Sequence, residues 1–262
     1  MQIEAGKLGK LTAEQARGMV EGTDIVRRNR DLSSLPLERV TPLIRHIYTR
    51  HVSWALFTQE YCDALHKLFG LLINGKRQAA RVLEVCAGSG ALVNPMRERG
   101  VEWSATDANP PKVTLGEVKT SGALAAVLEA APAKRADTGY GWVPAEIDAV
   151  FFAWWSKPKK PKRKQADEDA EEAVVDDPVP EDCRLVAHCL QMDIPVVFLS
   201  EPEGGLTGSP ELWAGEYQII PAAELVKGIV DVTRWKGFSD STYVILPRNS
   251  DVKWRARSEV VF

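Results

Sequence analysis

The chain has 262 residues, of which 45% are hydrophobic, and its formal net charge is −3. This length can bury one substantial core, and we expect one elaborated domain rather than two small ones. No apolar run approaches the roughly 20 residues of a membrane helix, and the first thirty residues lack the features of a secretory signal. These observations argue against membrane insertion and secretion, and we expect a soluble, cytoplasmic protein.

The first part of the chain predicts helices. Thr12–Gln15 has the pattern of a capping box, and Thr41 is a second candidate helix start. Thr58 precedes a third helical stretch, in which four large side chains share one face, namely Tyr61, Leu65, Leu68 and Phe69. We therefore predict an N-terminal helical extension over residues 1–78 and an α/β domain over residues 79–262.

Short apolar runs alternate with helical segments from residue 81 onward. Seven strands are predicted, at Val82–Cys86, Trp103–Thr106, Val113–Val118, Ala149–Trp154, Val196–Ser200, Val230–Trp235 and Thr242–Leu246. Alternation of this kind predicts a mostly parallel sheet covered by helices on both faces. The linker 236–241 is too short for a helical crossover, so the last two strands should form an antiparallel hairpin. The predicted fold is Rossmann-like, with the seven-stranded arrangement of the class I methyltransferase sheet.

Charge is concentrated in one segment between the fourth and fifth predicted strands. Lys157 to Lys164 carries six positive residues and Asp167 to Asp182 carries nine negative ones, which leaves the rest of the chain formally neutral. A neutral body lacks the positive charge that supplies most non-specific affinity for duplex DNA. This balance disfavours duplex DNA as a substrate and favours a small molecule or a protein.

The charged stretch 157–180 has no aromatic residue and four prolines. Because such a segment cannot bury enough apolar surface to order itself, we predict a disordered insertion. Its basic run 158–164 resembles a nuclear-import or nucleic-acid patch. Contact of this insertion with a protein or a nucleic acid, and a nuclear location, stay open beside the interpretation as a solvated loop.

The strongest local signal is the run Val-Leu-Glu-Val-Cys-Ala-Gly-Ser-Gly at positions 82–90, a strand that leads into a small-residue turn. Gly88 and Gly90 allow unusual dihedrals and close approach of a ligand to the main chain. Amide groups at the start of the next helix attract an anion. A dinucleotide site would have a third glycine at position 93, which is Val93, and this disfavours NAD.

An acidic residue is expected at the end of the second strand, and Asp107 follows the predicted strand there, seventeen positions after Gly90. Its carboxylate can accept hydrogen bonds from two ribose hydroxyls. The alternative is that Gly88, Gly90 and Asp107 only shape turns in a sheet that binds no ligand. Glu84, in the first strand, needs a partner if it is buried.

Five stretches together resemble a little-characterised branch of S-adenosyl-L-methionine (SAM)-dependent methyltransferase-like proteins, over roughly Ser53 to Arg248 with gaps. They are Ser53-Trp54-Ala55, Glu84 to Gly90, Asp107 to Pro111, Phe151 to Trp154, and Ser200-Glu201 with Gly204 to Gly208. The resemblance implies SAM as the cofactor and places Glu84 near its amino group. The residues expected to bind the cofactor are Glu84, Cys86, Ala87, Gly88, Gly90, Asp107 and Ala108.

The chain departs from that branch at the end of the fourth strand. The branch usually has Trp-Pro-Pro followed by an aromatic residue, whereas this chain has Trp154-Trp155-Ser156. The amine-methylating mechanism of the doubled-proline loop therefore does not carry over. Trp155 and Ser156 are candidates for stacking on or hydrogen bonding to an acceptor, and Glu201 for orienting it or accepting a proton. A core tryptophan and a plain turn are the alternatives.

Two further departures concern the turn itself. Pro95 lies within the helix expected after the glycines, which predicts a late helix start with Asn94 as the cap. Cys86 stands where the superfamily often has glycine and should narrow the cleft. The four cysteines are scattered without the paired spacing of a zinc site, and we expect no metal.

These patterns predict a SAM-dependent methyltransferase that acts on an unknown acceptor. The alternative is a catalytically inactive protein of methyltransferase fold that serves in binding or assembly, with the charged insertion as its docking segment. A nucleotide-dependent oxidoreductase is a third reading, which Val93 disfavours.

Overall fold

A computed structural model describes seven parts of the chain, residues 57–73, 79–132, 145–153, 179–201, 208–227, 229 and 241–247. Several predicted features lie outside these residues. They are the helix starts at Thr12 and Thr41, the strand Val230–Trp235, the end of the fourth strand from Trp154 to Ser156, and the charged insertion up to residue 178.

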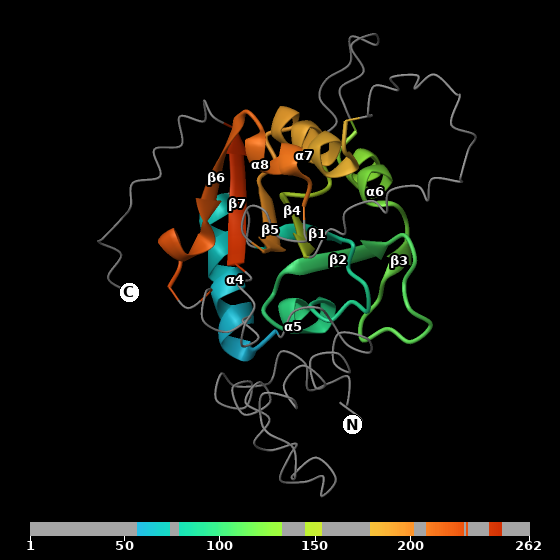
Figure 1. Ribbon diagram of the computed structural model, residues 1–262. Coiled ribbons are helices and arrows are strands. Elements are labelled where there is room, and N and C mark those ends of the chain that lie inside the picture. Colours follow the sequence, from blue (N-terminus) through green and yellow to red (C-terminus); the bar gives the residue numbers. More distant parts are fainter. Residues whose placement is uncertain are drawn as a thin grey trace, which may run out of the picture.

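The described elements form one mixed sheet with helices on both faces (Figure 1). The strands are β1 (Arg81–Val85), β2 (Glu102–Asp107), β3 (Lys119–Thr120), β4 (Ala149–Ala153), β5 (Val196–Ser200), β6 (Tyr217–Pro221) and β7 (Ser241–Pro247). Their order is β3-β2-β1-β4-β5-β7-β6. β1 to β5 are parallel, and β7 is antiparallel to both β5 and β6. This confirms the predicted fold, including the antiparallel C-terminal pair of the class I methyltransferase sheet.

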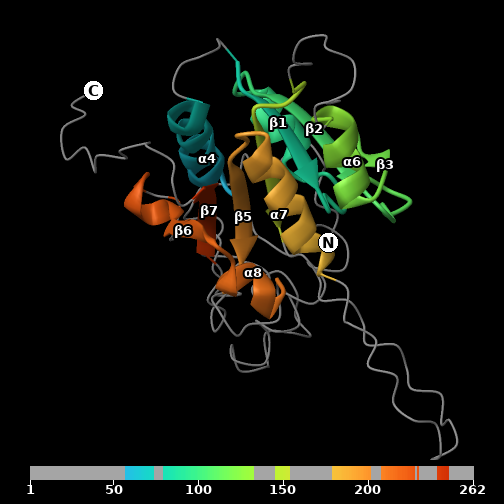
Figure 2. The ribbon, with the colours of Figure 1, turned by 90° about the horizontal axis from the view of Figure 1, so that it is seen from above.

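Helices divide between the two faces of the sheet (Figure 2). One face packs against α4 (Gln59–Ile73) and α5 (Val93–Arg97), with the short 3-10 helix η2 (Ala222–Glu224) on the same side. The other face packs against α6 (Ala123–Ala130), α7 (Glu181–Gln191) and α8 (Pro210–Ala214). The central strands β4 and β5 are buried on both faces, as their continuous apolar runs predict.

The helix predicted after Thr58 is α4. The Thr58 hydroxyl accepts a hydrogen bond from the Tyr61 amide at 3.2 Å, which is an N-cap contact. The predicted apolar face is buried against the sheet. The Tyr61 hydroxyl also forms a 3.1 Å hydrogen bond with the Thr242 hydroxyl of β7. This helix of the predicted extension therefore belongs to the core of the α/β body, and the boundary at residues 78 and 79 stays a prediction.

The third strand was predicted wrongly at Val113–Val118, since β3 is the two-residue strand Lys119–Thr120. The residues that precede β3 form a loop that packs against the glycine turn. The Leu115 amide donates to the Ser89 carbonyl at 2.7 Å. A Cβ atom on Gly116 would lie only 2.8 Å from the Gly90 carbonyl oxygen. The segment is thus anchored by its contacts with the turn rather than by strand pairing.

Two other boundaries also differ from the prediction. The strand that pairs with β7 at the C-terminal edge is β6, Tyr217–Pro221, which was not among the predicted strands. Helix α5 begins at Val93 with Leu92 as its cap, so Asn94 is not the cap. Pro95 falls in the first turn, where a missing amide hydrogen leaves no helix bond unmade. Asn94 instead donates its side-chain amide to the Leu115 carbonyl at 3.0 Å.

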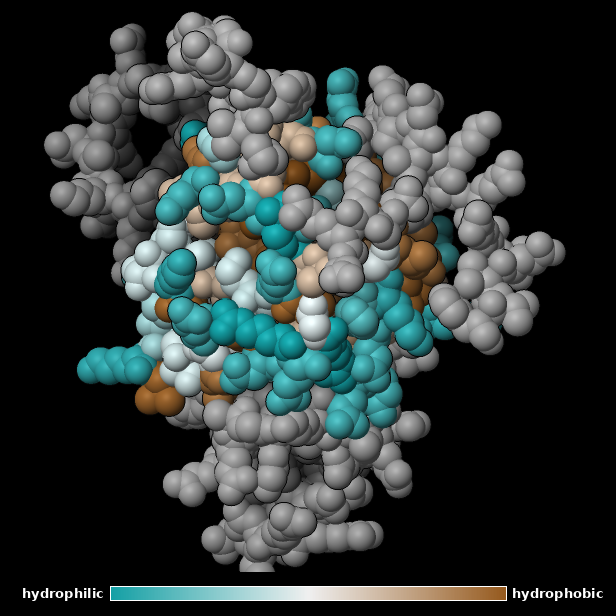
Figure 3. Space-filling view, turned by 180° about the vertical axis from the view of Figure 1, so that it is seen from behind, coloured by the Kyte–Doolittle hydropathy of each residue, from teal (hydrophilic) through white to brown (hydrophobic). Residues whose placement is uncertain are grey.

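On the face shown in Figure 3, the coloured residues are largely hydrophilic, with small hydrophobic areas between them. Among the described residues, four large apolar side chains are exposed and lie apart in the chain, Leu71 on α4, Leu128 on α6, Val113 before β3 and Val179 before α7. Single exposed apolar residues of this kind are usual on a protein surface. Within the described ranges, no helix combines the length and the apolar character needed to cross a membrane.

Candidate functional site

A tight turn follows β1 at the carboxyl edge of the sheet. Cys86, Gly88 and Gly90 all have left-handed backbone conformations, with φ angles of 55°, 55° and 71°. The Ala87 amide donates to the Thr106 carbonyl of β2 at 3.0 Å, and the Gly90 amide donates to the Ala87 carbonyl at 2.9 Å. Glycine adopts this backbone region without strain, which explains two of the three residues. The turn is therefore tied to the end of the neighbouring strand.

The two glycines of the turn have different surroundings. A Cβ atom on Gly90 would lie 2.6 Å from the Val118 side chain, so the absence of a side chain there allows the protein to pack. A Cβ atom on Gly88 would meet no atom within 4 Å. The main chain is accordingly open to approach at Gly88 and covered by protein at Gly90.

Asp107 faces this turn from the end of β2. Its Oδ2 atom accepts a hydrogen bond from the Gly88 amide at 2.8 Å. Its Oδ1 atom accepts one from the Asn109 amide, also at 2.8 Å. A carboxylate has about four lone-pair positions, so capacity to accept further hydrogen bonds remains. The structure thus brings Asp107 and Gly88 into direct contact.

Glu84 is a buried acid with a partner that the sequence reading missed. Its side chain is 3% exposed, and Oε2 accepts a 2.7 Å hydrogen bond from the Trp103 indole nitrogen. Burial raises the pKa of Glu84 to about 8, and the nearby Asp107 adds to the rise. Trp103 of β2 pairs with Val82 of β1, so its side chain lies on the same face of the sheet as Glu84 and diagonally opposite to it. A tryptophan at this position of the second strand is the sequence feature that could have predicted the contact.

Cys86 lies among carboxyl groups rather than cations. Burial, with smaller contributions from Asp107, Glu181 and Glu84, raises the pKa of its thiol to about 12. A neutral thiol is a poor nucleophile, so Cys86 is suited to lining the turn and not to covalent chemistry. Glu181 is the first residue of α7, and its Oε1 atom accepts a hydrogen bond from the Leu124 amide of α6 at 3.4 Å.

The remaining candidate residues are only partly brought together. Ala87 is half-buried in the turn, and Ala108 is exposed next to Asp107. Glu201 is half-buried directly after β5, two strands away from β1 in the sheet. Trp155 and Ser156 lie outside the described residues. The structure therefore places the predicted cofactor residues around one turn, whereas the predicted acceptor site is represented by Glu201 alone.

No protein-family model matches the sequence, and no curated protein matches it either. Among solved structures, the chain is similar to magnesium protoporphyrin IX methyltransferase from Synechocystis with bound SAM, at 11% identity and a TM-score of 0.35, over 72% of this chain and 80% of that one. It is similar to a SAM-dependent methyltransferase from Archaeoglobus fulgidus at 13% identity and a TM-score of 0.36, over 70% and 92% of the two chains. Human methyltransferase-like protein 13 matches at 12% identity and a TM-score of 0.37, over 72% and 84%.

Two small residues that follow β3 contact the candidate site but were not among the predicted site residues. Ser121 and Gly122 precede α6, and the Ser121 amide donates to the Asp107 carbonyl at 3.0 Å. The prediction did not include them because it ended the third strand at Val118, before the observed β3. A small-residue pair before the alanine-rich run Ala123–Ala130 is a helix-start signal that could have located them.

The adjacent His188 and Cys189 of α7 are packing residues. The His188 Nε2 atom forms a 2.7 Å hydrogen bond with the Ala131 carbonyl oxygen at the end of α6, and Cys189 is fully buried in the core. In the part of the chain that the structure describes, no three histidine, cysteine or acidic side chains are grouped as a metal site requires.

The raised pKa of Glu84 predicts how stability depends on pH. The folded protein keeps the Glu84 proton between the ordinary value of 4.5 and about 8, while the unfolded chain has released it. This group therefore makes stability fall as the pH rises through that window. Glu84→Gln keeps an oxygen for the Trp103 indole and removes the charge. We expect its free energy of unfolding to exceed that of the wild type by about 1–4 kcal/mol at pH 8 and to match it near pH 4.

Urea denaturation from pH 4 to pH 8.5 measures this difference. Asp63→Asn is the control, because the Asp63 side chain is 59% exposed and pairs with Arg99 at the surface. Its pH profile should follow that of the wild type within about 0.5 kcal/mol. An unchanged profile in Glu84→Gln would mean that Glu84 is already ionised in the folded protein at neutral pH.

Proposed function

We propose that this chain is a SAM-dependent methyltransferase that binds its cofactor at the glycine turn. One observation carries the proposal, namely the open main chain at Gly88 beside the Asp107 carboxylate, at the carboxyl edge of a parallel sheet. Ligands of open α/β sheets bind at this edge. In the proposed complex, Asp107 accepts hydrogen bonds from the ribose hydroxyls, while Gly88 and Ala87 line the ligand with backbone.

The charge around the turn favours a cationic ligand. Asp107 and Glu181 act electrostatically on the Cys86 thiol, whereas Glu84 keeps its proton at neutral pH and adds no charge. SAM carries a sulfonium and an ammonium group, which such surroundings stabilise, whereas the diphosphate of NAD would be repelled. Val93, where a dinucleotide site would have its third glycine, packs against Gly90 and Gly116 instead. Both features support SAM over a dinucleotide.

Methyl transfer makes modest chemical demands on the protein. A lone pair of the acceptor forms a bond to the methyl carbon, and the carbon–sulfur bond breaks with its electron pair moving to sulfur. The protein then contributes mainly by aligning the three atoms and excluding water. Trp155, Ser156 and Glu201 are the residues we propose for holding the acceptor, which the charge balance favours as a small molecule or a protein. A neutral Cys86 is compatible with this direct displacement.

Isothermal titration of the purified protein with SAM, its demethylated product S-adenosyl-L-homocysteine (SAH) and NAD tests the cofactor. We expect SAM and SAH to bind with Kd values in the micromolar range, about −8 kcal/mol, and NAD to release no heat. Tighter binding of NAD than of SAM, or no binding of SAM at about 1 mM, would refute the proposal.

Turnover separates the enzyme from the second candidate, a binding protein that retains the fold. The Trp-Trp-Ser sequence in place of the doubled proline favours that alternative. Transfer of a labelled methyl group from SAM to small amines, peptides or RNA would establish the enzyme. SAM binding without transfer to any of these acceptor classes would favour the binding protein.

A further inference from the structure

The loop between β2 and β3 binds the main chain of the glycine turn. The Leu115 amide donates to the Ser89 carbonyl at 2.7 Å, and the Gly116 amide donates to the same oxygen at 3.4 Å. Ser89 is 7% exposed and lies between the two glycines of the turn. Because a buried carbonyl without a donor costs free energy, these amides stabilise the turn in its observed form.

Close packing of main chain on main chain accompanies these hydrogen bonds. A Cβ atom on Gly116 would lie 2.5 Å from the Cβ atom of Val93 and 2.8 Å from the Gly90 carbonyl oxygen. Separations this short are steric overlaps, so the loop reaches the turn here because Gly116 has no side chain. The loop is therefore closely fitted to the Gly90 side of the turn, whereas the main chain at Gly88 stays open.

The start of the same loop holds the other side of the turn. Asp107 accepts the Gly88 amide through Oδ2 and the Asn109 amide through Oδ1, both at 2.8 Å. The Gly88 amide is thus bound at the start of the loop, and the carbonyl of the next residue, Ser89, is bound by its later part. One loop therefore fixes both ends of the Gly88–Ser89 dipeptide, at the place where we propose that the cofactor binds.

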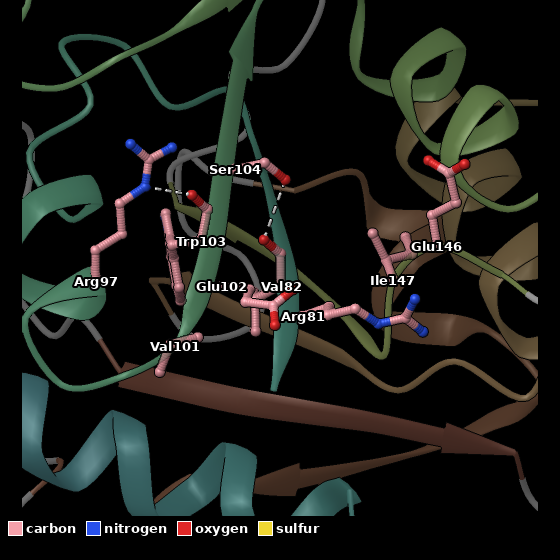
Figure 4. A pocket seen from close by; sticks show the side chains of 9 residues that line it. All are labelled: Arg81, Val82, Arg97, Val101, Glu102, Trp103, Ser104, Glu146 and Ile147. Carbon is pink, nitrogen blue, oxygen red and sulfur yellow. Dashed lines mark hydrogen bonds between the residues drawn. The ribbon is translucent and has the colours of Figure 1, made fainter. Parts of the chain in front are cut away.

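Two side chains of α5 hold the later part of the loop. The Asn94 side-chain amide donates to the Leu115 carbonyl at 3.0 Å. Figure 4 shows Arg97 beside an open groove, with its Nε atom directed at the Trp103 carbonyl at 2.9 Å. Arg97 also pairs with Glu117 at 3.3 Å, but these side chains are 44% and 66% exposed. Such a pair contributes little, whereas Asn94 acts directly on the main chain of the loop.

We propose that Asn94 is a positioning residue for the cofactor site. By holding the Leu115 main chain, it keeps the Gly88–Ser89 dipeptide in the orientation in which the Gly88 amide meets Asp107. A preorganised turn binds a ligand more tightly, because its main chain loses less freedom on binding. The inference rests on the proposed function for the identity of the ligand, and it adds a residue that acts through the loop without touching that ligand.

Asn94→Asp tests this role, since it keeps the shape of the side chain and places a carboxylate oxygen against the Leu115 carbonyl. We expect the Kd for SAM in isothermal titration near neutral pH to rise at least about tenfold. The added negative charge alone would favour cationic SAM, so a direct electrostatic effect has the opposite sign. The matched control is Glu117→Gln, which changes a side-chain contact of the same loop and should change the Kd less than about twofold.

Amide hydrogen exchange of the ligand-free protein, resolved by NMR, measures the positioning itself. Exchange at Gly88 and Leu115 should be at least about tenfold faster in Asn94→Asp than in the wild type, and unchanged in Glu117→Gln. The urea unfolding midpoints of both variants should stay close to that of the wild type, because both replaced side chains are exposed. A role in global stability alone would shift the midpoint and not the exchange at the turn.

Three results would overturn the role of Asn94. They are unchanged exchange at Gly88 in Asn94→Asp, wild-type affinity for SAM despite faster exchange, and equal effects of Asn94→Asp and Glu117→Gln on both measurements. A wild-type protein that does not bind SAM would instead refute the proposed function. In that case the exchange at Gly88 still decides whether Asn94 orders the turn.

Discussion

Replacing Asp107 with alanine should lower the affinity for SAM at least about 100-fold, because the variant loses two charge-assisted hydrogen bonds to the ribose at about 1.5–3 kcal/mol each. The same carboxylate accepts the Gly88 and Asn109 amides, so the unliganded turn also loses two contacts. Isothermal titration with SAM measures the affinity, and urea denaturation measures the accompanying loss of stability.

Asp107→Asn separates these two contributions. Its side-chain oxygen can still accept the Gly88 amide, but the negative charge and one acceptor atom are gone. We expect an unfolding free energy close to that of the wild type and a SAM affinity between those of the wild type and Asp107→Ala. If Asp107→Ala bound SAM as tightly as the wild type, the assignment of Asp107 to the ribose would be wrong.

Filling the open space at Gly88 should weaken SAM binding about 10- to 100-fold without a comparable loss of stability. Gly88→Asn is the appropriate change, since asparagine tolerates the left-handed conformation at φ 55° better than most residues. The new side chain would project where no protein atom lies within 4 Å of the Cβ position. We therefore expect it to displace the cofactor while lowering the unfolding free energy by only about 1 kcal/mol.

Gly90→Ala is the matched control in the same turn. Its methyl group would lie 2.6 Å from the Val118 side chain. Overpacking together with the unfavourable φ angle should destabilise the fold by about 2–4 kcal/mol. Unfolding monitored by circular dichroism gives the stability of both variants. A Gly88→Asn protein that binds SAM with wild-type affinity would show that the ligand does not approach the main chain at this glycine.

The central strands could be predicted because their patterns are strong over short distances. β5 was predicted with its observed bounds, and β1 differs by one residue at each end. β4 begins where it was predicted, and its predicted last residue, Trp154, lies outside the described residues. β4 and β5 are mostly apolar runs that helices bury on both faces of the sheet, and β1 is apolar except for Arg81 and Glu84. This signal needs no knowledge of the partner strands. The glycine turn and Asp107 follow directly from the ends of β1 and β2.

The edge strands could not be predicted in the same way. β3 has two exposed residues, so it lacks any pattern of burial, and the apolar residues before it pack on the glycine turn instead. β6 is mixed in burial and ends in a proline. Edge strands are specified by the one neighbour they pair with, which here is β2 or β7.

Local patterns in the chain thus specify the sheet class, the turn after β1 and the acid at the end of β2, because each depends on neighbouring residues alone. The different surroundings of Gly88 and Gly90 depend on a loop about 25 residues further along the chain. The hydrogen bond from Trp103 to Glu84 and the position of Glu181 beside α6 likewise join residues that are far apart in sequence. Such contacts arise only when the strands have paired and the helices have packed, and for that reason they required the folded structure.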